Sequence, residues 1–127
     1  MGPSLRIRDH WLMGNVDSIG ALYEAFNARD VDAVLAALAA DVRWPNAWEG
    51  GVVHGHAGVR DYWRRQWAEI DPHVEPTAIE EQEDGSVAVR VHQVVRTLKG
   101  ELVAENDVVH VYRFEHGLIS EMTIEDG

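Results

Sequence analysis

Residues Trp44 to Trp67, WPNAWEGGVVHGHAGVRDYWRRQW, hold four of the five tryptophans of this 127-residue chain and decide its fold. The second half of the segment carries apolar residues at helical spacing, namely Val59, Tyr62, Trp63, Trp67 and Ile70. Residues spaced in this way lie on one face of an amphipathic helix, here together with Gln66. Three large aromatic side chains on one face need a broad concave partner. We therefore expect the rest of the chain to supply a curved surface.

Two shorter amphipathic helices are predicted upstream. Their apolar faces are Ile19, Leu22, Tyr23 and Phe26 in the first, and Val31, Val34, Leu35 and Leu38 in the second. Asp30 can cap the second helix, because its carboxylate accepts hydrogen bonds from free backbone N–H groups. Residues 41–44 then form a short strand that stops at Pro45. Residues 10–13 are expected to be a lead-in that packs against the edge of the domain.

Downstream of the third helix, which we expect to end near residues 71–72, the apolar period changes to two. Three turn signals separate the strands of this part, namely Asp84-Gly85, Lys99-Gly100 and His116-Gly117. The strands are predicted over residues 74–83, 86–98, 102–115 and 118–126. Helices followed by an antiparallel meander predict an α+β fold, with residues 1–127 as a single domain.

Alternation along the strands separates an inward face from an outward one. The inward set in residues 102–115 is Leu102, Ala104, Asn106, Val108, His110, Tyr112 and Phe114. In residues 86–98 it is Val87, Val89, Val91, Gln93 and Val95, and in the last strand Leu118, Ser120, Met122, Ile124 and Asp126. The outward face carries apolar residues amid charges, namely Ala88, Val94, Val109 and Val111.

Composition excludes several classes of protein. The formal net charge of −11 leaves no basic patch for phosphates, so we expect no nucleic-acid partner. Without cysteine, the chain has no disulfide, no thiolate nucleophile and no cysteine-based zinc site. Lys99 is the single lysine, which argues against Schiff-base chemistry. The longest apolar run, residues 33–40, is too short to span a bilayer, and we see no secretory signal. We therefore expect a cytoplasmic location and no membrane partner.

Four short motifs occur in a fixed order along these elements. They are Asn27-Ala28-Arg29-Asp30, Ala40-Asp41-Val42, the Gly55 to Trp63 segment, and His110 to Phe114 before the last turn. With them the chain resembles the NTF2-like superfamily, in particular its SnoaL-like and ketosteroid isomerase-like branch, over nearly its whole length. The resemblance implies a cone in which three N-terminal helices pack on a curved antiparallel sheet. It also implies a homodimer that joins the outer faces of two sheets.

The catalytic residues of ketosteroid isomerases are not found at the matching positions of this chain. The position of their general base, an Asp, falls on Asn46, and that of their protonated Asp falls on His110. The position of their oxyanion-hole tyrosine falls on Leu22, with Tyr23 beside it but turned by ~100° around the helix axis. Because base, tyrosine and acid all differ, the resemblance does not imply steroid isomerisation by that mechanism.

His110 is the candidate catalytic residue, and two interpretations of it are open. In a pocket it acts as an acid or base, because the unperturbed pKa of histidine is about 6.5. In a core without a pocket, its ring only forms a hydrogen bond to a neighbouring group and has a structural role. A partner that fixes its tautomer can come from Asn46, Gln93, Asn106 or Asp126.

Ligand contacts are expected from Tyr23, Trp44, Asn46, Trp48, Trp63, Trp67, Gln93 and Tyr112. The tryptophans either form plain core or line a cavity, and so much indole in a small cone favours a cavity. Asn46 and Trp48 follow the first strand and are expected at the pocket mouth, although Asn46 can equally be a turn residue. Gln93 interrupts a run of inward valines, as polar residues that orient a ligand do.

His54 and His56 invite a metal interpretation. They stand on a predicted loop without helical spacing, and no third ligand follows at a fixed distance. We therefore expect no metal and no cofactor.

Two hypotheses of function follow. The first is a SnoaL-like enzyme that binds a small apolar or aromatic compound, with His110 as acid/base and Asn46 or Gln93 polarising a carbonyl. Isomerase, cyclase, dehydratase and hydrolase reactions all use such groups. The second is a module of the same fold that binds a small ligand or dimerises without catalysis. The missing Asp base favours the second hypothesis, and an inward His110 favours the first.

Overall fold

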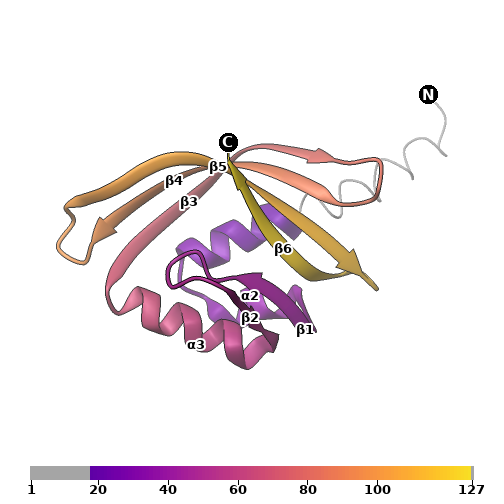
Figure 1. Ribbon diagram of the computed structural model, residues 1–127, viewed down its shortest axis with the longest axis horizontal. Coiled ribbons are helices and arrows are strands. Elements are labelled where there is room, and N and C mark those ends of the chain that lie inside the picture. Colours follow the sequence, from indigo (N-terminus) through magenta and orange to yellow (C-terminus); the bar gives the residue numbers. More distant parts are fainter. Residues whose placement is uncertain (1–17, 127) are drawn as a thin grey trace.

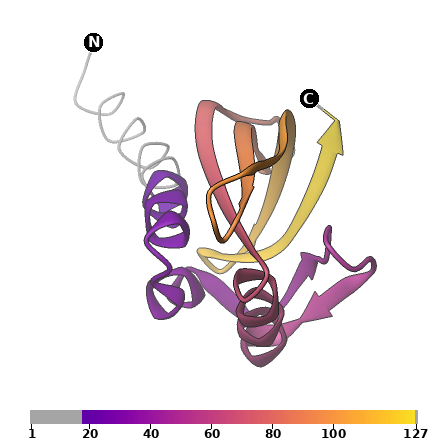
Figure 2. The same cartoon turned by 90° about the vertical axis from the view of Figure 1, so that its left-hand side faces the viewer.

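The computed structural model describes residues 18–126, which form three helices and one curved sheet (Figure 1). The first helix and α3 (Gly55–Trp67) lie against one side of the curved sheet and close it into a cone (Figure 2). The predicted α+β cone with N-terminal helices is thus confirmed. The lead-in predicted at residues 10–13 lies outside the described residues. None of the described helices is long and apolar enough to cross a membrane.

The second helix and α3 begin close to where the sequence predicts them but end earlier. The first helix is described over residues 18–27, and α2 spans Val31–Ala36. Asp30 caps α2 by accepting a hydrogen bond from the Ala33 backbone N–H at 3.2 Å. The second helix ends before Leu38 and α3 ends before the predicted residues 71–72, because Leu38 and Ile70 already pair with neighbouring strands.

Six strands form the sheet in the order β2-β1-β6-β5-β4-β3. Their bounds are Leu38–Pro45 (β1), Val52–His54 (β2), Ile70–Glu81 (β3), Val87–Thr97 (β4), Leu102–Glu115 (β5) and Leu118–Asp126 (β6). The last four strands make the predicted antiparallel meander, whereas β1 runs parallel to β6. β1 is longer than predicted, and β2 occupies a segment for which the sequence predicts a loop.

The predicted inward residues of β4 and of the second half of β5 are buried, namely Val87, Val89, Val91, Val108, His110 and Tyr112. At the start of β5 the prediction is wrong, because Leu102, Ala104 and Asn106 are exposed. In β6 the prediction is wrong at Leu118 and Ser120, because Ile119 is the buried residue there. The pairing of β5 with β6 shifts register at residues 113–114, and this irregularity reverses the alternation of side chains. Met122 then faces inward as predicted.

The turn after the first helix ties the helical layer to β3. Asn27 Nδ2 donates to the Val74 carbonyl at 2.7 Å, and the Val74 N–H donates to Asn27 Oδ1 at 3.0 Å. Arg29 donates to the Pro72 carbonyl at 2.7 Å and forms an ion pair with Asp71. Because β3 is the last strand of the sheet, these contacts cover an edge that would otherwise expose backbone groups.

Candidate functional site

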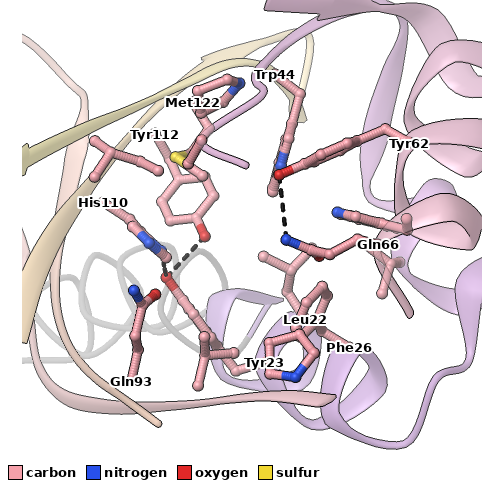
Figure 3. A pocket seen from close by; sticks show the side chains of 17 residues that line it. Leu22, Tyr23, Phe26, Trp44, Tyr62, Gln66, Gln93, His110, Tyr112 and Met122 are labelled. Atoms are coloured by element: carbon pink, nitrogen blue, oxygen red, sulfur yellow. Dashed lines mark hydrogen bonds between the residues drawn. The ribbon is translucent and has the colours of Figure 1, made fainter. Parts of the chain in front are cut away.

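A cavity lies between the first helix, α3 and the inner face of the sheet (Figure 3). Its volume is about 90 Å³, whereas one buried water needs roughly 10–15 Å³. Six aromatic side chains line it, namely Tyr23, Phe26, Trp44, Tyr62, Trp63 and Tyr112. The cavity is therefore large enough for a small ligand and mostly apolar in its walls.

Three buried polar groups form a hydrogen-bonded chain at the wall of this cavity. The Tyr23 hydroxyl lies 2.7 Å from His110 Nδ1, and the Tyr112 hydroxyl donates to the Tyr23 oxygen at 2.8 Å (Figure 3). Tyr23, Tyr112 and His110 are 3 %, 1 % and 7 % exposed, so bulk water does not compete for these bonds. We call this arrangement the Tyr112–Tyr23–His110 chain.

Two elements position the chain. His110 and Tyr112 stand two residues apart on β5 and therefore share its inward face. Tyr23 comes from the buried face of the first helix, 87 residues away from His110 in sequence. None of the four partners proposed for His110 from the sequence bonds to it in the described residues. Tyr23 lies on the inward face of the first helix and lines the cavity, as expected from the sequence, and its hydroxyl reaches His110.

The cavity is electrically neutral near pH 7. Burial lowers the pKa of His110 from 6.5 to about 4, so its imidazole carries no charge. Burial also raises the pKa values of Tyr23 and Tyr112 above that of a free tyrosine, so both keep their protons. No carboxylate, ammonium or guanidinium group occurs among the described residues that line the cavity.

Two glutamines add polar groups to the cavity wall. Gln93 lines the cavity as predicted, and its Nε2 donates to Asn106 Oδ1 at 3.2 Å. Gln66 lines it from α3, and its Nε2 donates to the Tyr62 hydroxyl at 3.3 Å (Figure 3). Within residues 18–126, the carbonyl oxygen of each amide has no hydrogen-bond donor and can accept one from a ligand. Gln66 was not selected from the sequence as a site residue, although its position on the aromatic face of α3 signals it.

The tryptophans divide between cavity and core. Trp44 and Trp63 line the cavity, with ring centroids 5.5 Å apart in an edge-to-face contact. Trp67 does not line it, and this prediction is corrected. Its ring stacks on Trp63 at 5.7 Å, meets Phe26 at 5.3 Å and is covered by the Arg29 guanidinium at 4.9 Å. These contacts hold the Trp67 ring behind Trp63 instead of exposing it to the cavity.

Asn46 and Trp48 do not line the cavity either. Asn46 is buried, and its amide organises the loop by donating to Glu49 Oε1 at 2.9 Å and accepting from the Glu49 N–H at 2.7 Å. Both polar ends of Asn46 are therefore engaged, and the turn-residue alternative holds. Trp48 is 36 % exposed on the same loop. Pro45 and Ala47 line the cavity in their place.

His54 and His56 are separated by the start of α3. His56 Nε2 lies 2.8 Å from the Leu38 carbonyl oxygen and so joins α3 to β1. In the part of the chain that the structure describes, no group of three or more His, Cys, Asp or Glu side chains could hold a metal ion.

The sequence matches the family model of the SnoaL-like domain over residues 19–122. The chain belongs to the SnoaL-like family. No curated protein matches it. An NTF2-like protein of unknown function from Burkholderia pseudomallei K96243 is 31 % identical, with a TM-score of 0.78 over 90 % of this chain and 91 % of that chain. The NTF2-like assignment and the SnoaL-like branch expected from the motifs are thereby confirmed.

Two further related structures contain small molecules. TerC, co-crystallised with polyporic acid, is 26 % identical, with a TM-score of 0.77 over 90 % of this chain and 92 % of TerC. A Mycobacterium tuberculosis protein in complex with estradiol-17β-hemisuccinate is 19 % identical, with a TM-score of 0.73 over 86 % of this chain and 90 % of that chain. At that identity the second likeness shows the fold alone.

Proposed function

We propose that this SnoaL-like protein binds a small apolar or aromatic compound in its cavity and that His110 is the acid/base residue of a reaction on it. The observation that carries the proposal is the Tyr112–Tyr23–His110 chain in the wall of an otherwise apolar cavity. A few oriented polar groups in a mostly apolar pocket are typical of small-molecule sites. The small molecules bound by TerC and by the Mycobacterium tuberculosis protein support the same use of the fold.

His110 acts in this proposal as a neutral imidazole. Because burial holds its pKa near 4, it donates a hydrogen bond to a substrate oxygen without carrying a charge of its own. Neutral histidines polarise carbonyl groups in this way, and the gain grows as negative charge develops on the oxygen. Gln93 offers a second polar contact to the same substrate. Isomerisation, cyclisation, dehydration and hydrolysis all benefit from such a group.

A second candidate is ligand binding without turnover. The specific observation in its favour is that the described lining residues include no carboxylate, so a strong general base for carbon acids is missing there. The low pKa of His110 also makes it a weak base. Both candidates share the cavity and differ only in whether product forms.

Binding is tested by nuclear magnetic resonance. On addition of acetophenone or 2-acetonaphthone to ¹⁵N-labelled protein, we expect the side-chain amide signals of Gln66 and Gln93 to shift, because both residues line the cavity. The matched control is the amide of Gln82, which bonds only to Glu80 in the described residues and lies in the hairpin between β3 and β4. Unchanged Gln66 and Gln93 signals with every probe would exclude the cavity as a binding site for this class of compound.

Catalysis is tested with His110→Gln, which keeps a hydrogen-bonding side chain of similar volume but cannot titrate. If His110 is the acid/base residue, turnover falls by about 10²- to 10⁴-fold. Ligand affinity changes little, since one hydrogen bond to a neutral group contributes roughly 0.5–1.5 kcal/mol. Equal turnover in the variant would exclude proton transfer by His110, because the Gln amide can still donate a hydrogen bond. A wild-type protein that binds the ligand and never releases a product would be a binding module.

We also propose a homodimer that joins two outer sheet faces. Four partly buried residues give this face its apolar character, namely Ala88, Val94, Val109 and Val111. Such a surface on a small protein favours a protein partner. The cytoplasmic location stays a prediction from the sequence.

A further inference from the structure

The direction of the Tyr112–Tyr23–His110 chain follows from the number of protons available to it. A tyrosine hydroxyl has one proton to donate. Within residues 18–126, the only hydrogen-bond partner of the buried Tyr112 hydroxyl is Tyr23. If Tyr23 donated to Tyr112, the Tyr112 proton would be left in the interior without an acceptor, which costs free energy. The stable direction is therefore Tyr112 to Tyr23 to His110.

This direction fixes the tautomer of the histidine. Because the Tyr23 hydroxyl donates its proton to His110 Nδ1, that nitrogen must accept the 2.7 Å hydrogen bond with its lone pair. A neutral imidazole with a free Nδ1 carries its proton on Nε2, which is then a donor and not an acceptor. Among the described residues, Trp67 Nε1 is the one side-chain N or O atom that is both inaccessible to solvent and without a hydrogen-bond partner. His110 Nε2, which has no partner there, is thus open to the cavity that His110 lines.

From this geometry we infer that the ligand is an uncharged one-ring compound whose carbonyl oxygen accepts a hydrogen bond from His110 Nε2. The inference rests on the proposed function and names the polarity and charge of the ligand. An alcohol or amine proton directed at Nε2 finds no lone pair. A carboxylate finds no cation among the described lining residues, and an unpaired buried charge is costly.

A cationic ligand is the strongest competitor, because aromatic faces attract cations and the protein carries a net charge of −11. The cavity has six aromatic side chains but no described carboxylate, and the Nε2 proton of His110 repels a cation. A single ring also suits a cavity of about 90 Å³ better than a larger skeleton does.

The tautomer is measured directly from the ¹⁵N signals of the His110 ring. These signals are assigned by comparison with His110→Gln, in which they are absent. We expect the pattern of a neutral ring with a protonated Nε2 and an unprotonated Nδ1 at pH 7. Tyr112→Phe removes the first donor of the chain and should introduce the other tautomer. Tyr62→Phe is the matched control, because the Tyr62 hydroxyl bonds to Gln66 and not to His110. A wild-type ring protonated at Nδ1 would overturn the inference.

The ligand class is measured with four one-ring probes: acetophenone, ethylbenzene, benzoate and benzyltrimethylammonium. His110→Leu should weaken the binding of acetophenone roughly 2- to 13-fold, the equivalent of one hydrogen bond. The same substitution should leave the binding of ethylbenzene unchanged or make it tighter. Benzoate and benzyltrimethylammonium should bind the wild type at least about tenfold more weakly than acetophenone.

The outcomes separate this inference from the proposed function. If acetophenone and ethylbenzene bind and respond equally to His110→Leu, the cavity is a binding site but the carbonyl contact is wrong. If benzyltrimethylammonium binds best, the cavity is a cation site and the inference fails. If no probe binds the wild type, the proposed function fails and the inference fails with it.

Discussion

At the scale of single residues, His110 links stability to pH. Its pKa is lowered from 6.5 to about 4 in the folded protein, so the unfolded chain binds more protons between these values. Stability contributed by the neutral His110 is complete above pH 6.5 and is lost as the pH falls towards 4.

We predict that lowering the pH from 7 to 4.5 reduces the free energy of unfolding of the wild type by about 2–3 kcal/mol more than that of His110→Gln. The variant lacks the titrating group but keeps every carboxylate, so it cancels the acid sensitivity of the rest of the chain. Urea unfolding of both proteins at the two pH values measures the difference. Identical pH dependence would mean that His110 titrates alike in the folded and unfolded states.

At the scale of elements, the contact between the first helix and β3 holds the cavity closed at the sheet edge. The side chain of Asn27 satisfies both the N–H and the carbonyl of Val74, which is 8 % exposed. Because β3 has no further strand beside it in the described part of the chain, these groups have no other sheet partner there on that side.

Asn27→Ala should therefore lower the free energy of unfolding by about 1–3 kcal/mol, the cost of leaving buried backbone groups without partners. Glu24→Ala is the matched control on the same helix. Because Glu24 is exposed, its substitution should change the free energy of unfolding by no more than about 0.5 kcal/mol. Chemical denaturation measures both values. Faster amide hydrogen exchange at Val74 in Asn27→Ala alone would locate the change at the edge, and equal effects of the two substitutions would argue against an anchoring role.

At the scale of the whole molecule, the outer sheet face carries the proposed dimer contact. We predict that the wild type sediments at twice the 14.2 kDa mass of one chain at micromolar concentration. Val109→Glu should shift it to the single-chain mass, because a buried unpaired carboxylate is costly in an apolar contact. Leu98→Glu is the control, since Leu98 is 61 % exposed near the end of β4. A wild type that sediments as one chain at every concentration would refute the dimer.

The sequence by itself determined the features that depend on local backbone geometry. Apolar residues at helical spacing identified α3, and alternation placed His110 and Tyr112 on the same inward face of β5. Such patterns can be recognised in a sequence because side chains return to the same face about every 3.6 residues in an α-helix and about every two residues in a strand. Together with four short motifs, they were enough to predict the cone and the family.

Only the tertiary structure decided which side chains meet inside the cone. Tyr23 reaches His110 across 87 residues of sequence, Trp67 packs behind Trp63, and the amide of Asn46 folds back onto its own loop. One register shift between β5 and β6 was enough to exchange Leu118 for Ile119 in the core. Contacts of this kind depend on how separate elements pack and on small irregularities of pairing, and the period of a single element carries no information about either.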